Sequence, residues 1–144
     1  MKKIVVFINI MCSLFLFVGC RVPQNFPFLY DLSEVKYIEI VEVNGEGYGE
    51  EPPMRVIKTI SNKQAFLEDF LKLDCYVVYG DPQGLLSGDI AIKIEYKNGW
   101  YQLIAESGTA QYSYNEYYGK MCYDPYMVIS FKDEQLREFI FTYL

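Results

Sequence analysis

The most nucleophilic side chains in this sequence are the thiols of four cysteines, Cys12, Cys20, Cys75 and Cys122. The sequence contains no histidine. Because imidazole is the usual base that activates a cysteine or serine nucleophile, this composition argues against Cys-His and Ser-His-Asp catalysis and against most zinc sites. Thiols without such a base are better suited to disulfide formation or covalent modification than to catalysis.

Carboxylate and glycine motifs also provide no catalytic signature. The 19 Asp and Glu residues include none in a recognisable glycosidase context. Gly45, Gly47 and Gly49 lie between two expected strands, which is the wrong context for binding phosphate. The acidic loop of residues 44–51 lacks the ligand spacing of an EF-hand. We therefore expect no enzyme activity, no cofactor and no metal site; an enzyme that uses carboxylates is the least favoured alternative.

The first 19 residues have the composition of a signal peptide. Lys2 and Lys3 precede an apolar run over residues 4–18 that only Asn9 and Ser13 interrupt. At 1.5 Å per residue, a helix of this length covers roughly 22 Å, which is less than the ~30 Å hydrocarbon core of a bilayer. The run is therefore too short for a spanning helix and fits the apolar core of a secretory signal.

The run ends at Phe17-Val18-Gly19-Cys20, with a small residue directly before the cysteine. This ending resembles the lipobox of bacterial lipoproteins. The resemblance implies cleavage before Cys20, transfer of a diacylglyceryl group to its thiol, and residence on the outer side of a membrane. A plain secretory signal, or a buried apolar helix with an incidental cysteine, is the alternative. The resemblance covers residues 1–20 and identifies a trafficking class, not a domain family.

Removal of residues 1–19 makes the chain strongly acidic. It takes Lys2 and Lys3 from the 13 basic residues and none of the 19 acidic ones, so the mature chain has a formal charge of −8. This charge argues against binding to nucleic acid or to anionic lipid headgroups. The remaining length suits one domain with one hydrophobic core.

Residues 20–32 are expected to form the lipidated cysteine and a tether or N-terminal arm, followed by a single domain over residues 33–144. Pro23 and Pro27 discourage a helix in this segment. About twelve extended residues could hold the domain up to ~40 Å from the bilayer. Phe26, Phe28 and Leu29 make the segment more apolar than a pure linker, which predicts that part of it packs on the domain.

Hydrophobic periodicity predicts the elements that position these residues. The expected strands cover residues 35–43, 54–60, 75–79, 109–114 and 126–131 and the two arms of a hairpin over 90–106. The expected helices cover residues 62–73, with Ser61 as N-cap, and the end of the chain from 133. The order β-β-α-β-β-β-β-β-α predicts an α+β fold, in which both amphipathic helices pack on one face of a mostly antiparallel sheet and the other face is partly solvated.

The hairpin has the clearest local signal. Asn98-Gly99 is a preferred pair for a two-residue type I′ turn, which pairs Tyr96 with Tyr101. Strand alternation then places Tyr96 and Tyr101 on one face and Trp100 on the opposite, polar face.

Cys75 and Cys122 are the cysteines that remain for a disulfide after Cys12 is discarded and Cys20 is acylated. In an oxidising envelope a bridge would close a loop of ~48 residues and stabilise the fold by about 4 kcal/mol. The alternative is a pair of buried thiols, because cysteine packs well as a small apolar residue.

Tyrosine is over-represented, with 14 residues. Tyrosine suits contacts with carbohydrate and protein, but it is also a common residue of half-buried strands. The proposed binding face consists of Trp100, Tyr112, Tyr114, Tyr117 and Tyr118. The expected function is therefore a lipid-anchored binding module of the cell envelope, attached to the membrane through Cys20, with a protein or glycan partner and no nucleic acid. A small inhibitor or immunity-type protein with an acidic surface is the alternative, and an envelope enzyme that uses carboxylates is the least favoured one.

Overall fold

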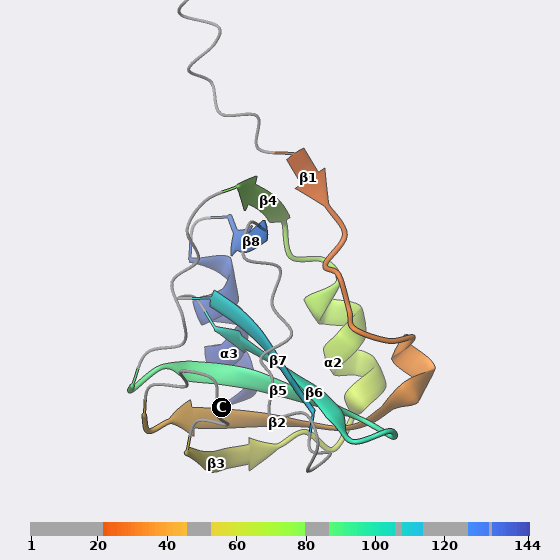
Figure 1. The fold of residues 1–144 in the computed structure, drawn as a ribbon, viewed down its shortest axis with the longest axis vertical. Helices are drawn as coiled ribbons and strands as arrows, with labels where there is room; N and C mark the ends of the chain where they lie inside the picture. The colour runs from red at the N-terminus through yellow and green to blue at the C-terminus, as the bar shows by residue number, and fades with distance from the viewer. Residues whose placement is uncertain (1–21, 46–52, 80–86, 106–107, 114–126, 133) are drawn as a thin grey trace, which may run out of the picture.

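The computed structural model describes residues 22–45, 53–79, 87–105, 108–113, 127–132 and 134–144 (Figure 1). For residues 22–24, 77–79, 108–113 and 127–128 it describes the backbone alone. These parts form two antiparallel sheets, two α-helices and the short 3-10 helix η1 (Leu32–Glu34). After β1 (Val22–Gln24) and η1, the strands and helices follow the predicted order, and the α+β class is confirmed.

The larger sheet has five strands, and every neighbouring pair is antiparallel. In spatial order the strands are β3 (Met54–Thr59), β2 (Val35–Val43), β5 (Ile90–Tyr96), β6 (Trp100–Ala105) and β7 (Gly108–Ser113). The side chains of the edge strand β3 are exposed from Arg55 to Thr59. The buried part of the sheet therefore begins at β2.

The expectation of one sheet is wrong, because β4 (Cys75–Tyr79) and β8 (Met127–Phe131) form a second sheet with β1. The helices explain the separation. The chain leaves β3 through α2 (Lys63–Phe70) before it enters β4, and it leaves β8 into α3 (Gln135–Tyr143). A helix of eight residues advances the chain by about 12 Å, so β4 starts away from the larger sheet, as Figure 1 shows.

Helix α2 begins one residue later than predicted. Asn62, not Ser61, is its N-cap, and the Asn62 side chain accepts a 3.1 Å hydrogen bond from the backbone N–H of Ala65. Asparagine and serine are similarly good N-caps, so local sequence did not distinguish the two positions. On the helix surface the side-chain amide of Gln64 donates a 2.9 Å hydrogen bond to the carboxylate of Glu68.

The main core lies between the larger sheet, the two helices and the N-terminal arm. The helices contribute Phe66, Leu67 and Phe70 from α2 and Leu136, Phe139 and Ile140 from α3. The sheet contributes Ile38, Ile40, Ile92, Ile94, Tyr96 and Ile104. The rings of Phe66 and Phe139 pack edge to face with their centroids 4.9 Å apart, which joins the two helices.

The opposite face of the larger sheet also carries a buried cluster. Its members, all at most 3% exposed, are Val41, Val43, Ala91, Tyr101, Leu103 and Ala105. The prediction that this face bears Trp100 is therefore wrong. The prediction that it is partly solvated is wrong where these six residues lie.

The predicted register of the β5–β6 hairpin is wrong by one residue. Tyr101 pairs with Glu95, and Gln102 pairs with Ile94. The N–H of Gly99 donates to the carbonyl of Tyr96 over 3.0 Å, and Gly99 has φ +86°, which glycine adopts without strain. These contacts fit a three-residue loop with glycine at its left-handed position, not a two-residue type I′ turn.

The one-residue change moves the side chains of β6 to opposite faces. Gln102 and Ile104 now share the face of Ile94 and Ile92, which is the face of the main core. In this register the side chains on both faces of β6 pack against apolar neighbours. Turn preference alone favoured the other loop, and packing on the two faces decided between them.

Candidate functional site

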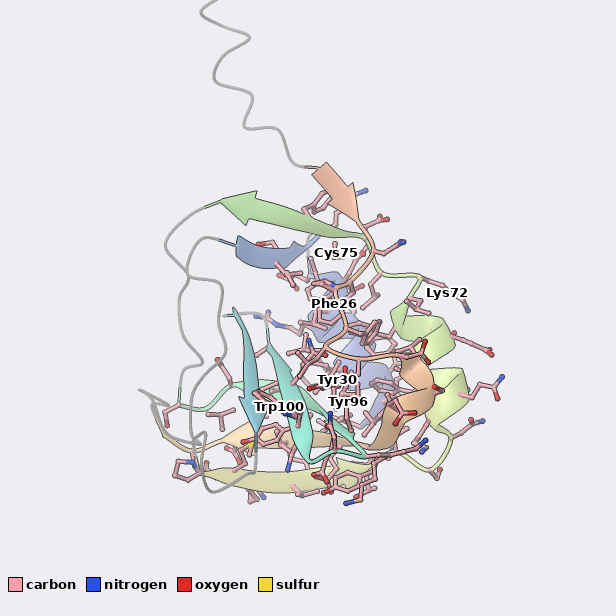
Figure 2. All side chains as sticks on the ribbon, turned by 45° about the vertical axis from the view of Figure 1, so that its right-hand side comes forward. Phe26, Tyr30, Lys72, Cys75, Tyr96 and Trp100 are labelled. Carbon is pink, nitrogen blue, oxygen red and sulfur yellow. The ribbon has the colours of Figure 1, made fainter. Side chains whose placement is uncertain are left out.

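Trp100 lies on the core side of the larger sheet, together with Tyr96. Its side chain is partly buried and packs against the main core (Figure 2). The prediction that Trp100 points away from Tyr96 is wrong, because the hairpin register differs. Tyr112 pairs with Tyr101 in the β6–β7 ladder, whereas Trp100 pairs with Ser113. Tyr114, Tyr117 and Tyr118 lie outside the described residues, so a binding face formed by all five residues stays a prediction.

Of the three cysteines with a predicted role, Cys75 is the one that lies in the described residues. Cys75 is buried on β4, and burial raises the pKa of its thiol, with the nearby carboxylate of Asp74 acting in the same direction. A thiol with a raised pKa is a poor nucleophile at neutral pH. Cys20 and Cys122 lie outside the described residues, so lipid attachment and the Cys75–Cys122 bridge remain predictions.

A buried carboxamide fastens the N-terminal arm to the larger sheet. Gln102 is fully buried on β6. Its Oε1 accepts hydrogen bonds from the backbone N–H of Leu29 at 2.9 Å and from the Tyr96 hydroxyl at 2.5 Å, and its Nε2 donates to the carbonyl of Pro27 at 3.1 Å. The predicted hairpin register would place Gln102 on the polar face with Trp100, so the sequence analysis missed this role. The available signal was a polar residue within an otherwise apolar strand.

The arm also contributes aromatic side chains to the core. Phe26 is buried and packs edge to face on Phe70 of α2, with ring centroids 5.1 Å apart, and on Phe28 at 4.9 Å. Tyr30 packs against Tyr96 in the same manner at 5.2 Å. Residues 25–32, expected to be tether or arm, are therefore part of the folded unit (Figure 2).

The phenol of Tyr96 is buried beneath the N-terminal arm, so we expect the protein to lose stability at alkaline pH. Burial raises the pKa of Tyr96 from 10.0 to about 12. The protonated phenol is thus favoured in the folded state, so this contribution is complete below pH 10 and is lost as the pH rises to about 12. The free energy of unfolding should fall over this range by on the order of 3 kcal/mol more than in Tyr96→Phe.

This expectation is checked by denaturant unfolding of both proteins at a series of pH values. Tyr30→Phe, at an exposed ring beside Tyr96, is the matched control. It should retain most of the natural pH dependence, because burial, and not the charge of Tyr30, is the largest cause that raises the pKa of Tyr96. Identical pH dependence of the natural protein and Tyr96→Phe would contradict the prediction.

An ionic cluster lies on the outer face of the larger sheet. Lys93 Nζ is 4.0 Å from a carboxylate oxygen of Glu39 and 3.9 Å from one of Glu95, and all three side chains are only 11–16% exposed. Lys36 donates to Glu95 over 3.1 Å, and the Tyr37 hydroxyl donates to the same carboxylate. Two ammonium groups thus face two carboxylates. The cluster is internally compensated, and we assign it a structural role.

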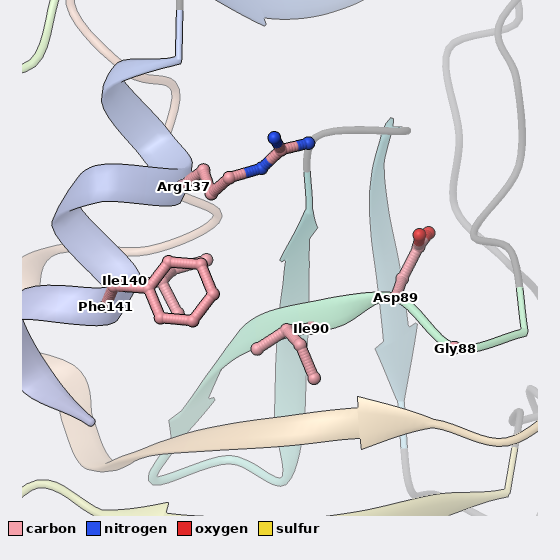
Figure 3. Close-up of a pocket in the computed structure, with 6 residues that line it drawn as sticks. All are labelled: Gly88, Asp89, Ile90, Arg137, Ile140 and Phe141. Atoms are coloured by element: carbon pink, nitrogen blue, oxygen red, sulfur yellow. The ribbon is translucent and has the colours of Figure 1, made fainter.

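A small cavity lies between the start of β5 and helix α3 (Figure 3). Its volume is about 210 Å³, and its lining comprises Gly88, Asp89, Ile90, Arg137, Ile140 and Phe141. Figure 3 shows the apolar side chains at its base and Arg137 and Asp89 extending on the same side of it. The cavity therefore combines an apolar floor with one charge of each sign at the rim.

Exposed apolar side chains continue from this cavity to the end of α3. Phe141 is 63% exposed and Leu144 is 43% exposed. Residues three apart on a helix are neighbours on its surface, so the two side chains form one apolar strip, which we call the α3 strip. Lys58 of β3 donates to the carbonyl of Leu144 over 3.3 Å, which holds the end of the strip against the larger sheet.

A second groove lies between η1 and α2. Its volume is about 320 Å³, and Leu32, Val35, Leu67 and Leu71 form its apolar lining. Lys63 at its margin is engaged, because its ammonium group donates to the carbonyls of Val35 and Lys36. Leu71 is the exposed member of this lining, at 50%. The cavity has a more exposed apolar side chain in its lining, Phe141 at 63%.

Among the described residues, no group of three or more Cys, Asp or Glu side chains is arranged to hold a metal ion. No helix in the described part of the chain is long and apolar enough to cross a membrane.

In comparisons with known proteins, no protein-family model, no curated protein and no solved structure matches this chain.

Proposed function

We propose that the mature protein is a lipid-anchored binding module of the cell envelope, held on the outer side of the membrane through Cys20. The N-terminal charge, the length of the apolar run and the Gly19-Cys20 ending support the anchor. The absence of histidine from the sequence supports a role in binding and not in catalysis.

The observation that carries the binding role is the α3 strip with its adjoining cavity. Large apolar side chains that stand exposed beside a cavity are typical of interaction sites. At about 210 Å³ the cavity is smaller than the ~300–1,000 Å³ of most small-molecule sites, so it fits one apolar side chain better than a free ligand. We therefore favour an envelope protein over a glycan as the partner.

The substitution Phe141→Ser tests this role. Burial of a phenylalanine side chain is worth roughly 1.5–3 kcal/mol, so the affinity for the partner should fall by about tenfold to a hundredfold. The stability of the protein itself should change by no more than ~0.5 kcal/mol, because Phe141 is exposed. The measurement is quantitative cross-linking of the anchored protein to its partner in intact cells, combined with thermal unfolding.

Leu71→Ser is the matched control, because it removes a similarly exposed apolar side chain from the η1–α2 groove. Retained cross-linking in Phe141→Ser with loss in Leu71→Ser would assign binding to the groove and contradict the proposal. Binding that is insensitive to Phe141→Ser but lost at high salt would favour the acidic inhibitor, since exposed charges are screened by salt.

A further inference from the structure

We infer that the three-stranded sheet β1-β4-β8 lies against the outer surface of the membrane, so that the domain sits directly on the bilayer in a defined orientation. This inference rests on the proposed lipid anchor at Cys20. It specifies which surface meets the phospholipid headgroups and which surface remains for a partner.

The first argument is covalent distance. Val22 is the first residue of β1, and its backbone pairs with Val77 of β4. Cys20 precedes Val22 by two residues, which span at most roughly 7 Å. The acyl chains would therefore enter the bilayer within that distance of β1, and not at the end of the ~40 Å tether that residues 20–32 could form if extended.

The second argument is that the arm is firmly attached to the domain. Detachment would break the hydrogen bonds of Gln102 with Leu29 and Pro27 and would expose the buried ring of Phe26. Burial of one such ring alone is worth roughly 1.5–3 kcal/mol. The arm therefore stays docked, and the short connection to Cys20 holds the whole domain close to the lipid.

The third argument is the chemistry of the outer face of this sheet. Cys75 and Phe131, which pair with each other, pack on the main core. Their neighbours Tyr76 and Ser130 also pair with each other and, by strand alternation, lie on the opposite face, where both are partly exposed. Neither is charged. Tyrosine is favoured at headgroup level, and this uncharged pair adds no repulsion toward anionic lipid. The exposed residues that flank the pair, Asp74 and Lys132, carry opposite charges.

This orientation places the α3 strip away from the membrane. Figure 1 shows β1, β4 and β8 together at one end of the molecule, and the end of α3, at the C-terminus, beside β2 near the other end. The strip would therefore face the envelope, where a protein partner can reach it.

The test uses photo-cross-linking to lipid, with the lipidated full mature protein reconstituted in vesicles of phosphatidylethanolamine and phosphatidylglycerol. A benzophenone amino acid replaces either Ser130, on the membrane-facing sheet, or Val56, which is 51% exposed on β3 at the opposite end. We expect phospholipid adducts, detected by mass spectrometry, at position 130 and none at position 56. Insertion of roughly ten Gly/Ser residues between Arg21 and Val22 adds about 17 Å of reach and should remove most adducts at position 130.

Vesicle flotation separates failure of this inference from failure of the anchor. A protein that does not float with the vesicles, or that floats equally well as Cys20→Ala, overturns the proposed anchor. A protein that floats through Cys20 but gives equal adducts at positions 130 and 56, or adducts that the Gly/Ser insertion leaves unchanged, overturns the orientation alone.

Discussion

Substitution of Cys20 by alanine should abolish fatty-acid labelling of the protein, and the chain should leave the membrane once residues 1–19 are removed. Each buried methylene contributes about 0.8 kcal/mol to membrane binding, and stable anchoring needs more than one acyl chain. Loss of the acyl chains therefore removes many kcal/mol of membrane affinity. The measurement is metabolic labelling with a clickable fatty acid, followed by membrane fractionation.

Cys12→Ala is the matched control for this experiment. Cys12 lies in the segment expected to be removed, so its substitution should leave labelling and fractionation unchanged. Labelling that persists in Cys20→Ala would refute the assignment of the lipid to Cys20.

Substitution of Gln102 by leucine should lower the free energy of unfolding by about 3 kcal/mol or more. The backbone N–H of Leu29, the carbonyl of Pro27 and the hydroxyl of Tyr96 would each lose a hydrogen bond at a site closed to solvent on the Gln102 side. A buried polar group that loses its partner costs about 1–3 kcal/mol, whereas the leucine adds no compensating bond. For a chain of this size the melting temperature should fall by roughly 10 °C.

Gln64→Leu is the matched control, because Gln64 is exposed on α2, where its side-chain amide donates to Glu68 on the helix surface. Its effect should stay within ~0.5 kcal/mol. A second readout is specific to the arm: Gln102→Leu should increase proteolysis within residues 25–31 before global unfolding. Equal stability and equal proteolysis of Gln102→Leu and the natural protein would show that the hydrogen bonds of Gln102 do not hold the arm.

The strands and helices were predictable because their patterns are local. Ile38 and Ile40 alternate in β2, and Phe66 and Phe70 have helical spacing in α2. All four side chains are buried, as their periodicity predicts. The carboxylate of Glu39 interrupted the apolar pattern of β2, and the structure explains it through the neighbouring ammonium group of Lys93. The sequence thus indicated an unusual position but not its partner, which comes from another strand.

The register of the hairpin shows why local patterns are insufficient. Asn98-Gly99 is compatible with a two-residue and with a three-residue loop, and both give alternating strands. The difference is whether Gln102 and Trp100 face the core. That choice depends on contacts with Pro27 and Leu29, which are more than seventy residues away in the chain.

The sequence by itself determined the properties that depend on composition and short-range order: the absence of histidine, the acidic charge and the α+β order of elements. The anchor at Cys20 stays a prediction from the sequence. The tertiary structure alone decided the division into two sheets, the docking of the arm, the face of Trp100, and the placement of Phe141 beside a cavity. The physical reason is that side-chain periods and turn preferences act over a few residues. Which faces meet, and which polar groups find partners, depends on segments that only the folded chain brings together.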